Sequence, residues 1–151
     1  MLKCQEFNIT VRKAKREDMI QVYKLVKDIT ARRSFDTESP AFTCIVAELS
    51  DGHIVGYALY YYSYSTWVGK SILLEDIYVQ PAYRRNGIGR QLFMAVVKIA
   101  HDSKIRRMDF HVLSWNPAVD FYKRLGAVNL TVTDKWHIFR MDHRCIQRLF
   151  P

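Results

Sequence analysis

The stretch LEDIYVQPAYRRNGIGRQLF, residues 74–93, combines the signals for a strand, a turn and a helix. Residues 72–79 are rich in β-branched and aromatic side chains, which favour a strand, and Pro81 ends it. From the Gly-Ile-Gly turn onward, apolar residues recur at the spacing of one buried helix face: Ile88, Leu92, Ala95, Val96 and Ile99. The stretch therefore predicts a strand and a turn that leads directly into a helix N-terminus.

The turn before this helix has the features of an anion site. The first N–H groups of a helix have no partner inside it and, together with the helix dipole, they favour negative charge. Gly87 and Gly89 would let a phosphate approach the backbone closely, and Arg84 and Arg85 add positive charge. The alternative is that the glycines only shape a turn and the arginines are solvated, and a bare G-x-G pattern favours that alternative.

The longer string, Arg-Arg-Asn-Gly-Ile-Gly after an apolar strand and before an amphipathic helix, resembles the acetyl-CoA signature of the GNAT family of N-acetyltransferases. In that family the pattern is Arg/Gln-x-x-Gly-x-Gly/Ala, and the loop amides hold the pyrophosphate of coenzyme A. The dinucleotide-binding pattern differs, because it needs a third glycine and a following acidic residue. The resemblance implies an acetyl-CoA site made by Ile77, Tyr78, Val79, Arg84, Arg85, Asn86, Gly87, Ile88, Gly89 and Arg90.

Length and composition predict one globular domain over residues 1–151. The chain is long enough for a full core, and its 49% apolar and 25% charged residues are ordinary for a soluble protein. No apolar run approaches the ~20 residues that span a bilayer, and residues 1–7 lack the core of a secretory signal. Cys4, Cys44 and Cys145 lack metal-ligand spacing, so we expect free thiols, a cytoplasmic location and no metal.

The formal charge of +8 is compatible with nucleic acid, an anionic membrane or an acidic ligand such as coenzyme A. Small basic clusters lie at 12–16, 32–33, 84–85 and 106–107, without a continuous stripe. We therefore read most of this charge as solvated surface and expect neither a nucleic-acid nor a membrane partner. The five histidines show no ligand spacing. His111 falls in the strand that would face the cofactor cleft; we expect a structural role for it, and the alternative is contact with the substrate.

The order of the predicted elements indicates an α/β fold with a mixed sheet and helices on both faces. Strands are expected near 8–12, 42–49, 54–64, 70–80, 107–113, 127–132 and 136–141, and helices within 14–29, 88–102 and 117–125. Residues 32–40 are expected to form a loop or a short helix, and residues 143–151 a tail. The order is similar to that of the GNAT acyl-CoA N-acyltransferase fold, in which the strands here at 72–80 and 107–113 splay apart and admit the pantetheine arm.

Acetyl transfer to an amine sets a definite chemical problem. An alkyl ammonium has a pKa near ~10, so a base must remove its proton at neutral pH. Donors must also stabilise the oxyanion, and an acid must protonate the leaving thiolate. Glu75 and Asp76 lie within the apolar strand, where alternation would point them to opposite faces, one toward the groove and one toward another partner.

A second motif surrounds Tyr122. Taken alone, Tyr122 in Phe-Tyr-Lys-Arg-Leu-Gly-Ala is more often a core aromatic with a satisfied hydroxyl. The block from Asn116 resembles the GNAT segment Asn-x-x-Ala-x-x-Phe-Tyr-x-x-x-Gly, in which the tyrosine is the usual proton donor to coenzyme A. The resemblance implies that role for Tyr122 and a pantetheine contact for Asn116, which precedes Tyr122 by six residues where the family usually has seven. Asn116 is also a plausible helix cap.

Three segments together are similar to the diamine (spermidine/spermine) N1-acetyltransferase and thialysine acetyltransferase branch: 60–70, 74–79 and 116–127. That resemblance implies a homodimer and a small amine substrate that is acetylated by direct attack in a ternary complex. Glu75 would deprotonate the amine, the N–H near Ile77 would polarise the thioester, and Asp76 and Trp67 would line the amine pocket. An amino acid whose carboxylate meets Arg32 or Arg33, or a protein amine, is the alternative acceptor.

Two other classes of function remain open. One is a non-catalytic acetyl-CoA-binding module, against which Glu75 and Tyr122 argue. The other is a nucleic-acid-binding domain, which rests on net charge alone and would lose affinity steeply with salt.

Overall fold

The computed structural model describes residues 7–29 and 41–149, so the predicted loop or helix at 32–40 lies outside the described residues. The chain divides into two compact units, Met1–His111 and Val112–Pro151, and each is described by itself. In the first unit the described elements are β1 (Ile9–Lys13), α1 (Met19–Ile29), β2 (Thr43–Leu49), β3 (Ile54–Ser65), β4 (Gly69–Val79), η1 (Pro81–Tyr83), α2 (Ile88–Asp102) and β5 (Met108–Phe110). In the second they are α3 (Ala118–Arg124), α4 (Leu130–Thr133) and α5 (His143–Leu149). A single domain over residues 1–151 stays a prediction.

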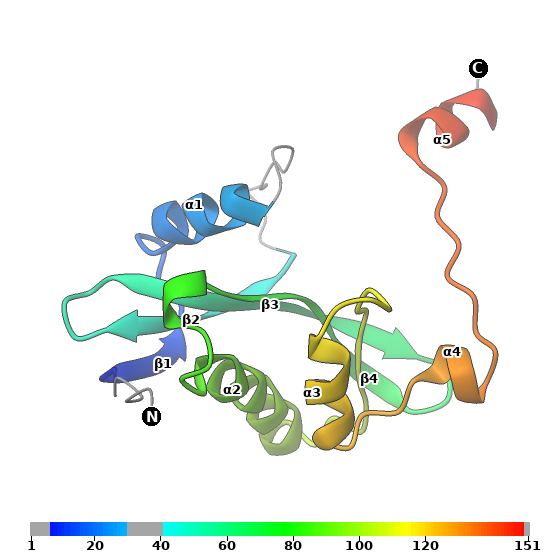
Figure 1. Cartoon of the computed structure of the whole chain (residues 1–151). Coiled ribbons are helices and arrows are strands. Elements are labelled where there is room, and N and C mark those ends of the chain that lie inside the picture. The colour runs from blue at the N-terminus through cyan, green and yellow to red at the C-terminus, as the bar shows by residue number, and fades with distance from the viewer. Residues whose placement is uncertain (1–6, 30–40, 150–151) are drawn as a thin grey trace. The chain divides into compact units, whose positions relative to one another are not determined.

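The first unit is built on a mixed five-stranded sheet in the order β1-β2-β3-β4-β5. The first four strands are antiparallel neighbours, whereas β4 and β5 run parallel. Helix α1 lies on one face of the sheet and α2 on the other (Figure 1). The predicted α/β class, with a mixed sheet between helices, is confirmed.

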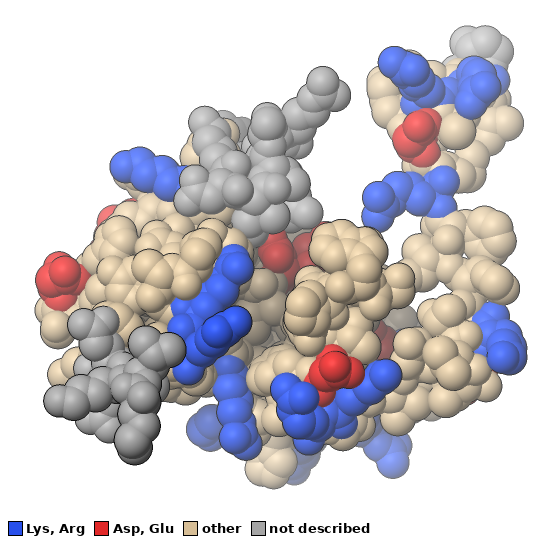
Figure 2. All heavy atoms as spheres, viewed as in Figure 1, with Lys and Arg blue, Asp and Glu red and all other residues tan. Residues whose placement is uncertain are grey.

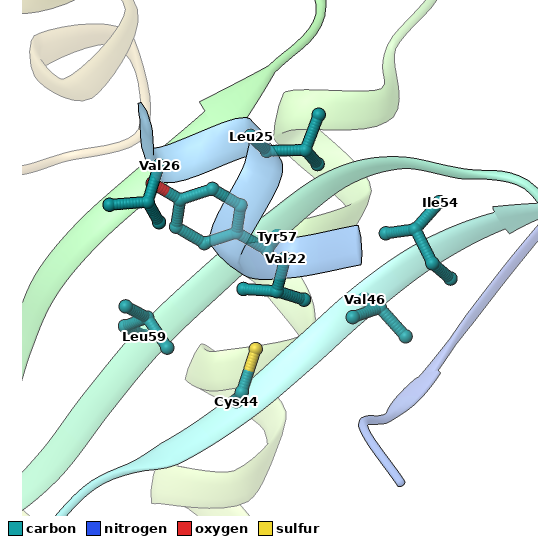
Figure 3. Close-up of a cluster of buried hydrophobic side chains, with 8 residues drawn as sticks. All are labelled: Val22, Leu25, Val26, Cys44, Val46, Ile54, Tyr57 and Leu59. Carbon is teal, nitrogen blue, oxygen red and sulfur yellow. The ribbon is translucent and has the colours of Figure 1, made fainter. Parts of the chain in front are cut away.

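One half of the core lies between α1 and the sheet (Figure 3). The apolar spacing of α1 turns one stripe of the helix toward alternate residues of the central strands. The buried cluster consists of Val22, Leu25 and Val26 from α1, Cys44 and Val46 from β2, and Ile54, Tyr57 and Leu59 from β3. Burial of each large apolar side chain contributes about 1.5–3 kcal/mol, so this cluster fixes α1 on the sheet.

The other half of the core lies under α2, whose bounds agree with the predicted helix. Its buried residues are Ile88, Leu92, Phe93, Val96 and Ala100. The predicted Ala95 and Ile99 are only half-buried, so the buried face is rotated slightly from the predicted one. A Cβ on Gly56 of β3 would lie 2.8 Å from the Tyr78 carbonyl oxygen and 3.2 Å from Leu92, so the glycine permits close packing of strand and helix here.

An ion-pair network ties β1 to the start of α1. Arg12 donates from Nη1 and Nη2 to Asp18 at 2.6 and 3.0 Å, and from Nε to Glu48 at 2.6 Å. The Asp18 carboxylate also accepts the Lys15 N–H at 2.6 Å. The hydrogen bonds from Arg12 lower the pKa of Asp18 from its ordinary value, against the opposing effect of burial.

Acidification is expected to destabilise the protein through Asp18. A lowered folded-state pKa gives stability that is fully present above the ordinary pKa of 3.8 and is lost as the pH falls through the folded-state value. Asp18→Asn should lower the free energy of unfolding by about 1.5–3 kcal/mol at neutral pH, the contribution of hydrogen bonds to a charged group. The difference in free energy of unfolding between wild type and Asp18→Asn should be smaller in acid, because protonation of Asp18 removes the same interaction from the wild type. Urea unfolding across the acid range measures it, with the exposed Glu17→Gln as control. Parallel pH dependences for wild type and Asp18→Asn would contradict the assignment.

The second unit departs from the predicted closing strands. In place of a strand at 127–132, Asn129 accepts the Thr131 N–H at 3.1 Å and caps the short helix α4. Residues 136–141 pair with no strand in the described part of the chain, so the second predicted strand is also wrong. Alternation of apolar and polar residues favours a strand only where a partner strand is available to pair with it. The predicted tail contains α5, where Asp142 accepts the Cys145 N–H at 2.8 Å.

Candidate functional site

Strand β4 has an open edge over its second half. Strand β5 pairs with Ile72, Leu73 and Leu74, and Leu74 opposite Phe110 is the last pair. Strand β4 continues to Val79, paired on its other side with β3. The predicted strand at 107–113 is thus shortened to Met108–Phe110. Among the described residues no strand continues the sheet beside 75–79. Strands β4 and β5 therefore stop pairing after Leu74, as is expected of two strands that splay apart.

The open edge presents backbone N–H groups. The Gln80 N–H donates to the Val55 carbonyl at 2.9 Å, so the amide of Gln80 points toward β3. Because amides alternate in direction along an antiparallel strand, those of Ile77 and Val79 point away from β3. The Val79 carbonyl also points away from β3, since it accepts a hydrogen bond from Nε of Arg84, a residue beyond the strand, at 2.8 Å. The open edge can therefore donate hydrogen bonds from Ile77 and Val79.

A β-bulge interrupts β4 at the candidate base. Leu59 pairs with Asp76, whereas the next residue of β3, Tyr60, pairs with Leu74. Glu75 is therefore an extra residue without a cross-strand partner. The prediction that Glu75 and Asp76 point to opposite faces assumed uninterrupted alternation, and that premise is wrong at the bulge. Alternation could not show this, because a bulge is defined by the register of both strands.

The two neighbouring carboxylates have different environments. The Asp76 side chain is half-buried, and its Oδ2 accepts the Tyr57 hydroxyl at 2.8 Å. Glu75 is exposed and makes no hydrogen bond or ion pair with another described residue. Asp76 is therefore held in place, whereas Glu75 is accessible to solvent and to a bound molecule. The sequence did not identify Tyr57, because its pairing with Asp76 depends on strand register.

The loop between β4 and α2 has the backbone geometry that the predicted anion site requires. Arg85 and Gly87 have positive φ, 65° and 76°, and Gly87 is the N-cap of α2. The Gln91 N–H donates to the Gly87 carbonyl at 3.0 Å, so the N–H groups of 88–90 precede the helical ladder. Asn86 braces the loop through Nδ2, which donates to the carbonyls of Tyr83 and Arg84 at 3.2 and 3.0 Å.

The electrostatics of this loop also favour an anion. Arg84, Arg85 and Arg90 are exposed. Basic side chains gather over the segment from η1 to the start of α2 (Figure 2). The Arg84 guanidinium lies 5.4 Å from the centre of the Tyr78 ring. The free amides, the helix dipole and these guanidinium groups fit a phosphate or pyrophosphate.

Helix α3 of the second unit carries the predicted acid. Tyr122 is 8% exposed, and its ring contacts Phe121 edge-on at 5.1 Å between centroids. Asn116 Oδ1 accepts the Ala118 N–H at 2.9 Å, which agrees with the expected cap. At the other end, Gly126 has φ 91°, and the Ala127 N–H donates to the Tyr122 carbonyl at 3.1 Å. This is a Schellman ending, which fixes the turn that carries Tyr122.

The sequence-predicted residues fall into three groups. Glu75 to Val79 and Arg84 to Arg90 lie on one continuous strand, loop and helix start. Trp67 lies in the β3–β4 turn and is 75% exposed, and the strand from Gly69 to Glu75 separates it from the bulge by roughly 20 Å. Asn116 and Tyr122 belong to the second unit.

The other residues considered from the sequence as ligands are the histidines and cysteines. His111 directly follows β5 and is exposed, so it is not a core histidine. In the part of the chain that the structure describes, no group of three or more His, Cys, Asp or Glu residues could hold a metal ion. Cys44 and Cys145 are free, and burial raises the pKa of the Cys44 thiol to about 12, so Cys44 is unreactive. Within the same described ranges, no helix has the length and apolar character needed to cross a membrane.

An open strand edge, followed by an anion-binding loop at a helix N-terminus, is the arrangement of an acyl-CoA-dependent transferase. The family model described as "Acetyltransferase (GNAT) family" matches residues 8–127, and the chain belongs to this family of acetyl-CoA-dependent N-acetyltransferases. Its relatives include a thialysine N-epsilon-acetyltransferase of Bos taurus, 35% identical over 93% of this chain and 96% of that protein. Another is the human spermidine/spermine N(1)-acetyltransferase-like protein 1, 35% identical over 83% of this chain and 19% of that protein.

Solved structures agree with the fold. An acetyltransferase of Trypanosoma brucei superposes with a TM-score of 0.73 at 20% identity, covering 89% of this chain and 99% of that one. A ribosomal-protein-alanine N-acetyltransferase of Brucella melitensis superposes with a TM-score of 0.71 at 16% identity, covering 89% of this chain and 99% of that one. At these identities the likeness concerns the fold alone.

Proposed function

We propose that this enzyme transfers the acetyl group of acetyl-CoA to a primary amine of a small cationic substrate. The observation that carries the proposal is the bulge in β4, where the exposed Glu75 lies at the start of the open edge. Strand β4 ends four residues later at Val79, and the arginine- and glycine-containing loop follows. Base, oxyanion donors and phosphate site thus follow one another along 75–90. Members of the family use acetyl-CoA as the acetyl donor.

Each step of the transfer has a residue to carry it. Glu75 takes a proton from the substrate ammonium, through water, and leaves a neutral nitrogen that attacks the thioester carbonyl. The Ile77 N–H donates to the carbonyl oxygen, where negative charge develops. The tetrahedral adduct then collapses: its carbon–sulfur bond breaks as the Tyr122 hydroxyl gives its proton to the departing thiolate. The nitrogen, which became cationic on attack, loses its second proton through water to the Tyr122 phenolate, which leaves the neutral amide and restores the hydroxyl. The attack is direct, within a ternary complex of enzyme, acetyl-CoA and amine.

The acceptor is a small amine that carries a second polar group. The relatives matched along most of their length bear the name thialysine N-epsilon-acetyltransferase, which favours an amino acid with a side-chain amine. The spermidine/spermine-like relative favours a diamine or polyamine. Asp76 would bind an ammonium group of either. Arg32 and Arg33, proposed for a substrate carboxylate, lie outside the described residues.

A thiol-release assay with a panel of amines tests the proposal. The panel holds thialysine, lysine, putrescine, spermidine, spermine, an arylalkylamine and a basic peptide, each with acetyl-CoA. Turnover with thialysine alone assigns the amino-acid substrate, and turnover with the polyamines assigns the diamine class. With the best amine, initial-rate lines that intersect when both substrates are varied support direct attack, whereas parallel lines contradict it. Coenzyme A binding without turnover of any amine would refute the proposal for small amines.

The loop at 84–90 is proposed to hold the pyrophosphate, with Asn116 as a contact for the pantetheine arm. Gly87→Ala tests the loop. A Cβ at Gly87 would meet no neighbouring atom, but φ is 76°, which is unfavourable for alanine. The loop of the variant should therefore relax to a different backbone conformation, and acetyl-CoA binding must return it to the strained one. Left-handed strain of roughly 1–2 kcal/mol corresponds to an increase in the acetyl-CoA KM of about five- to thirtyfold.

Gly69→Ala is the matched control for this prediction. Gly69 has φ 80° and equally open surroundings, but it lies in the β3–β4 hairpin. It should lower stability by a similar amount and leave the acetyl-CoA KM unchanged. Steady-state kinetics with acetyl-CoA varied measures both variants. Equal KM values in Gly87→Ala and wild type would remove the loop from the cofactor site.

A homodimer is proposed for the assembly. It is supported by the resemblance to the diamine and thialysine acetyltransferases and by large apolar side chains exposed near the C-terminus: Trp136, Ile138, Phe139 and Met141. Light scattering coupled to size-exclusion chromatography measures the mass. The free Cys44 and Cys145 support a reducing compartment such as the cytoplasm.

A further inference from the structure

The Tyr57 hydroxyl is a polar group at the edge of an apolar core. Tyr57 is fully buried on β3, within the cluster that packs against α1. Its hydroxyl donates to Asp76 Oδ2 at 2.8 Å. A buried hydroxyl without a hydrogen-bond partner costs free energy, so the folded protein favours keeping this bond. The same bond restricts the position of the Asp76 carboxylate.

The tyrosine ring is itself held on two sides. The α1 cluster packs against it, with Leu25 and Val26 close by in Figure 3. Its ring centroid lies 6.0 Å from that of Tyr78, which in turn lies under the Arg84 guanidinium. Tyrosine has two side-chain torsions, so a ring packed in this way keeps its hydroxyl in one place.

The bulge makes this contact selective between the two carboxylates. Asp76 pairs opposite Leu59, on the face of the sheet that α1 covers, and so reaches Tyr57. Glu75, the extra residue, is exposed and has no such donor among the described residues. One carboxylate is therefore fixed, and its neighbour is able to move.

We propose that Tyr57 is a positioning residue, which orients Asp76 as a fixed anion for a substrate ammonium group and thereby leaves Glu75 as the carboxylate that moves the proton. This inference rests on the proposed amine substrate and on Asp76 as its contact. It assigns the two carboxylates to separate tasks, binding by Asp76 and proton transfer by Glu75.

Tyr57→Phe removes the hydroxyl and keeps the ring. Without this hydroxyl the Asp76 carboxylate loses the hydrogen bond that orients its Oδ2, so we expect the KM for the amine to rise about five- to tenfold. The kcat and the acetyl-CoA KM should stay within about twofold of wild type, a split that a merely structural defect would not produce. Tyr64→Phe, the same change at a site that is 79% exposed, is the control and should alter none of these.

A double-mutant cycle with Asp76→Asn decides whether Tyr57 acts through Asp76. Asparagine keeps an oxygen for the Tyr57 hydroxyl but carries no charge, so it should raise the amine KM by at least as much as Tyr57→Phe. If Tyr57 acts through Asp76, adding Tyr57→Phe to Asp76→Asn should produce little further change. A normal amine KM in Tyr57→Phe, or multiplicative effects in the double variant, would overturn the positioning role alone. Absence of turnover with every amine in wild type would instead overturn the proposed function and this inference with it.

Discussion

Tyr122→Phe is expected to lower kcat by about 10²–10⁴-fold, the usual contribution of a general acid. The departing thiolate would then have to be protonated by solvent, while the acetyl-CoA KM should change little. The phenylalanine ring keeps the packing of Tyr122 against Phe121, and the Schellman ending at Gly126 depends on the backbone. Loss of the hydroxyl should therefore reduce the free energy of unfolding by no more than about 1.5 kcal/mol.

Steady-state kinetics and urea unfolding of the same preparation test this prediction. The exposed Tyr64→Phe again controls for removal of a phenolic hydroxyl. Wild-type kcat in Tyr122→Phe would show that the thiolate leaves without the help of Tyr122. A large loss of stability would instead assign a structural role to the hydroxyl.

Glu75→Gln should lower kcat by about 10²–10⁴-fold at neutral pH, because the variant cannot accept a proton from the ammonium. Glutamine has nearly the same volume, and the exposed Glu75 packs little against the fold, so stability should be unchanged. The deficit should shrink as the pH rises, since a growing fraction of the amine is then neutral in solution, with a pKa near ~10.

The pH dependence distinguishes a base from a binding carboxylate. Asp76→Asn should mainly raise the amine KM, whereas Glu75→Gln should mainly lower kcat. A constant ratio of wild-type to Glu75→Gln kcat between neutral and alkaline pH would contradict proton removal by Glu75. If Asp76→Asn instead lowered kcat and Glu75→Gln raised the amine KM, Asp76 would be the base and Glu75 the binding carboxylate.

Local sequence signals predicted the framework of the site well. Apolar periodicity placed α2 at 88–102, as observed, and the glycines with Arg84 marked the loop for which anion binding is proposed. These signals succeed because a strand end, a turn and a helix start are determined over a few neighbouring residues. Similarity to the GNAT family then supplied the chemistry that a G-x-G pattern alone does not specify.

The parts that the sequence did not predict depend on contacts between distant segments. The bulge at Glu75 results from the register between β3 and β4, so alternation along β4 alone does not determine how Glu75 is oriented relative to Asp76. The Tyr57–Asp76 hydrogen bond joins residues 19 apart on those strands. The strand predicted at 127–132 fails for the opposite reason, because the local cap at Asn129 begins a helix there.

The bulge gives two adjacent acidic residues different environments. In a regular strand, one of them would face away from the other. The extra residue leaves Asp76 bound to Tyr57 and Glu75 exposed beside the amides of the open edge. A local irregularity of the sheet thus places a hydrogen-bonded carboxylate and an exposed carboxylate next to each other, as the proposed division of their roles requires.

The most direct test of the account follows an isotopic label in the acetyl group of acetyl-CoA. The purified enzyme is incubated with labelled acetyl-CoA and either thialysine or spermidine, and mass spectrometry quantifies the products. The account predicts labelled N-acetylamine and free coenzyme A in equal amounts, with both lost in Glu75→Gln at neutral pH. Label recovered as free acetate, or coenzyme A bound without any acetylated amine, would contradict it.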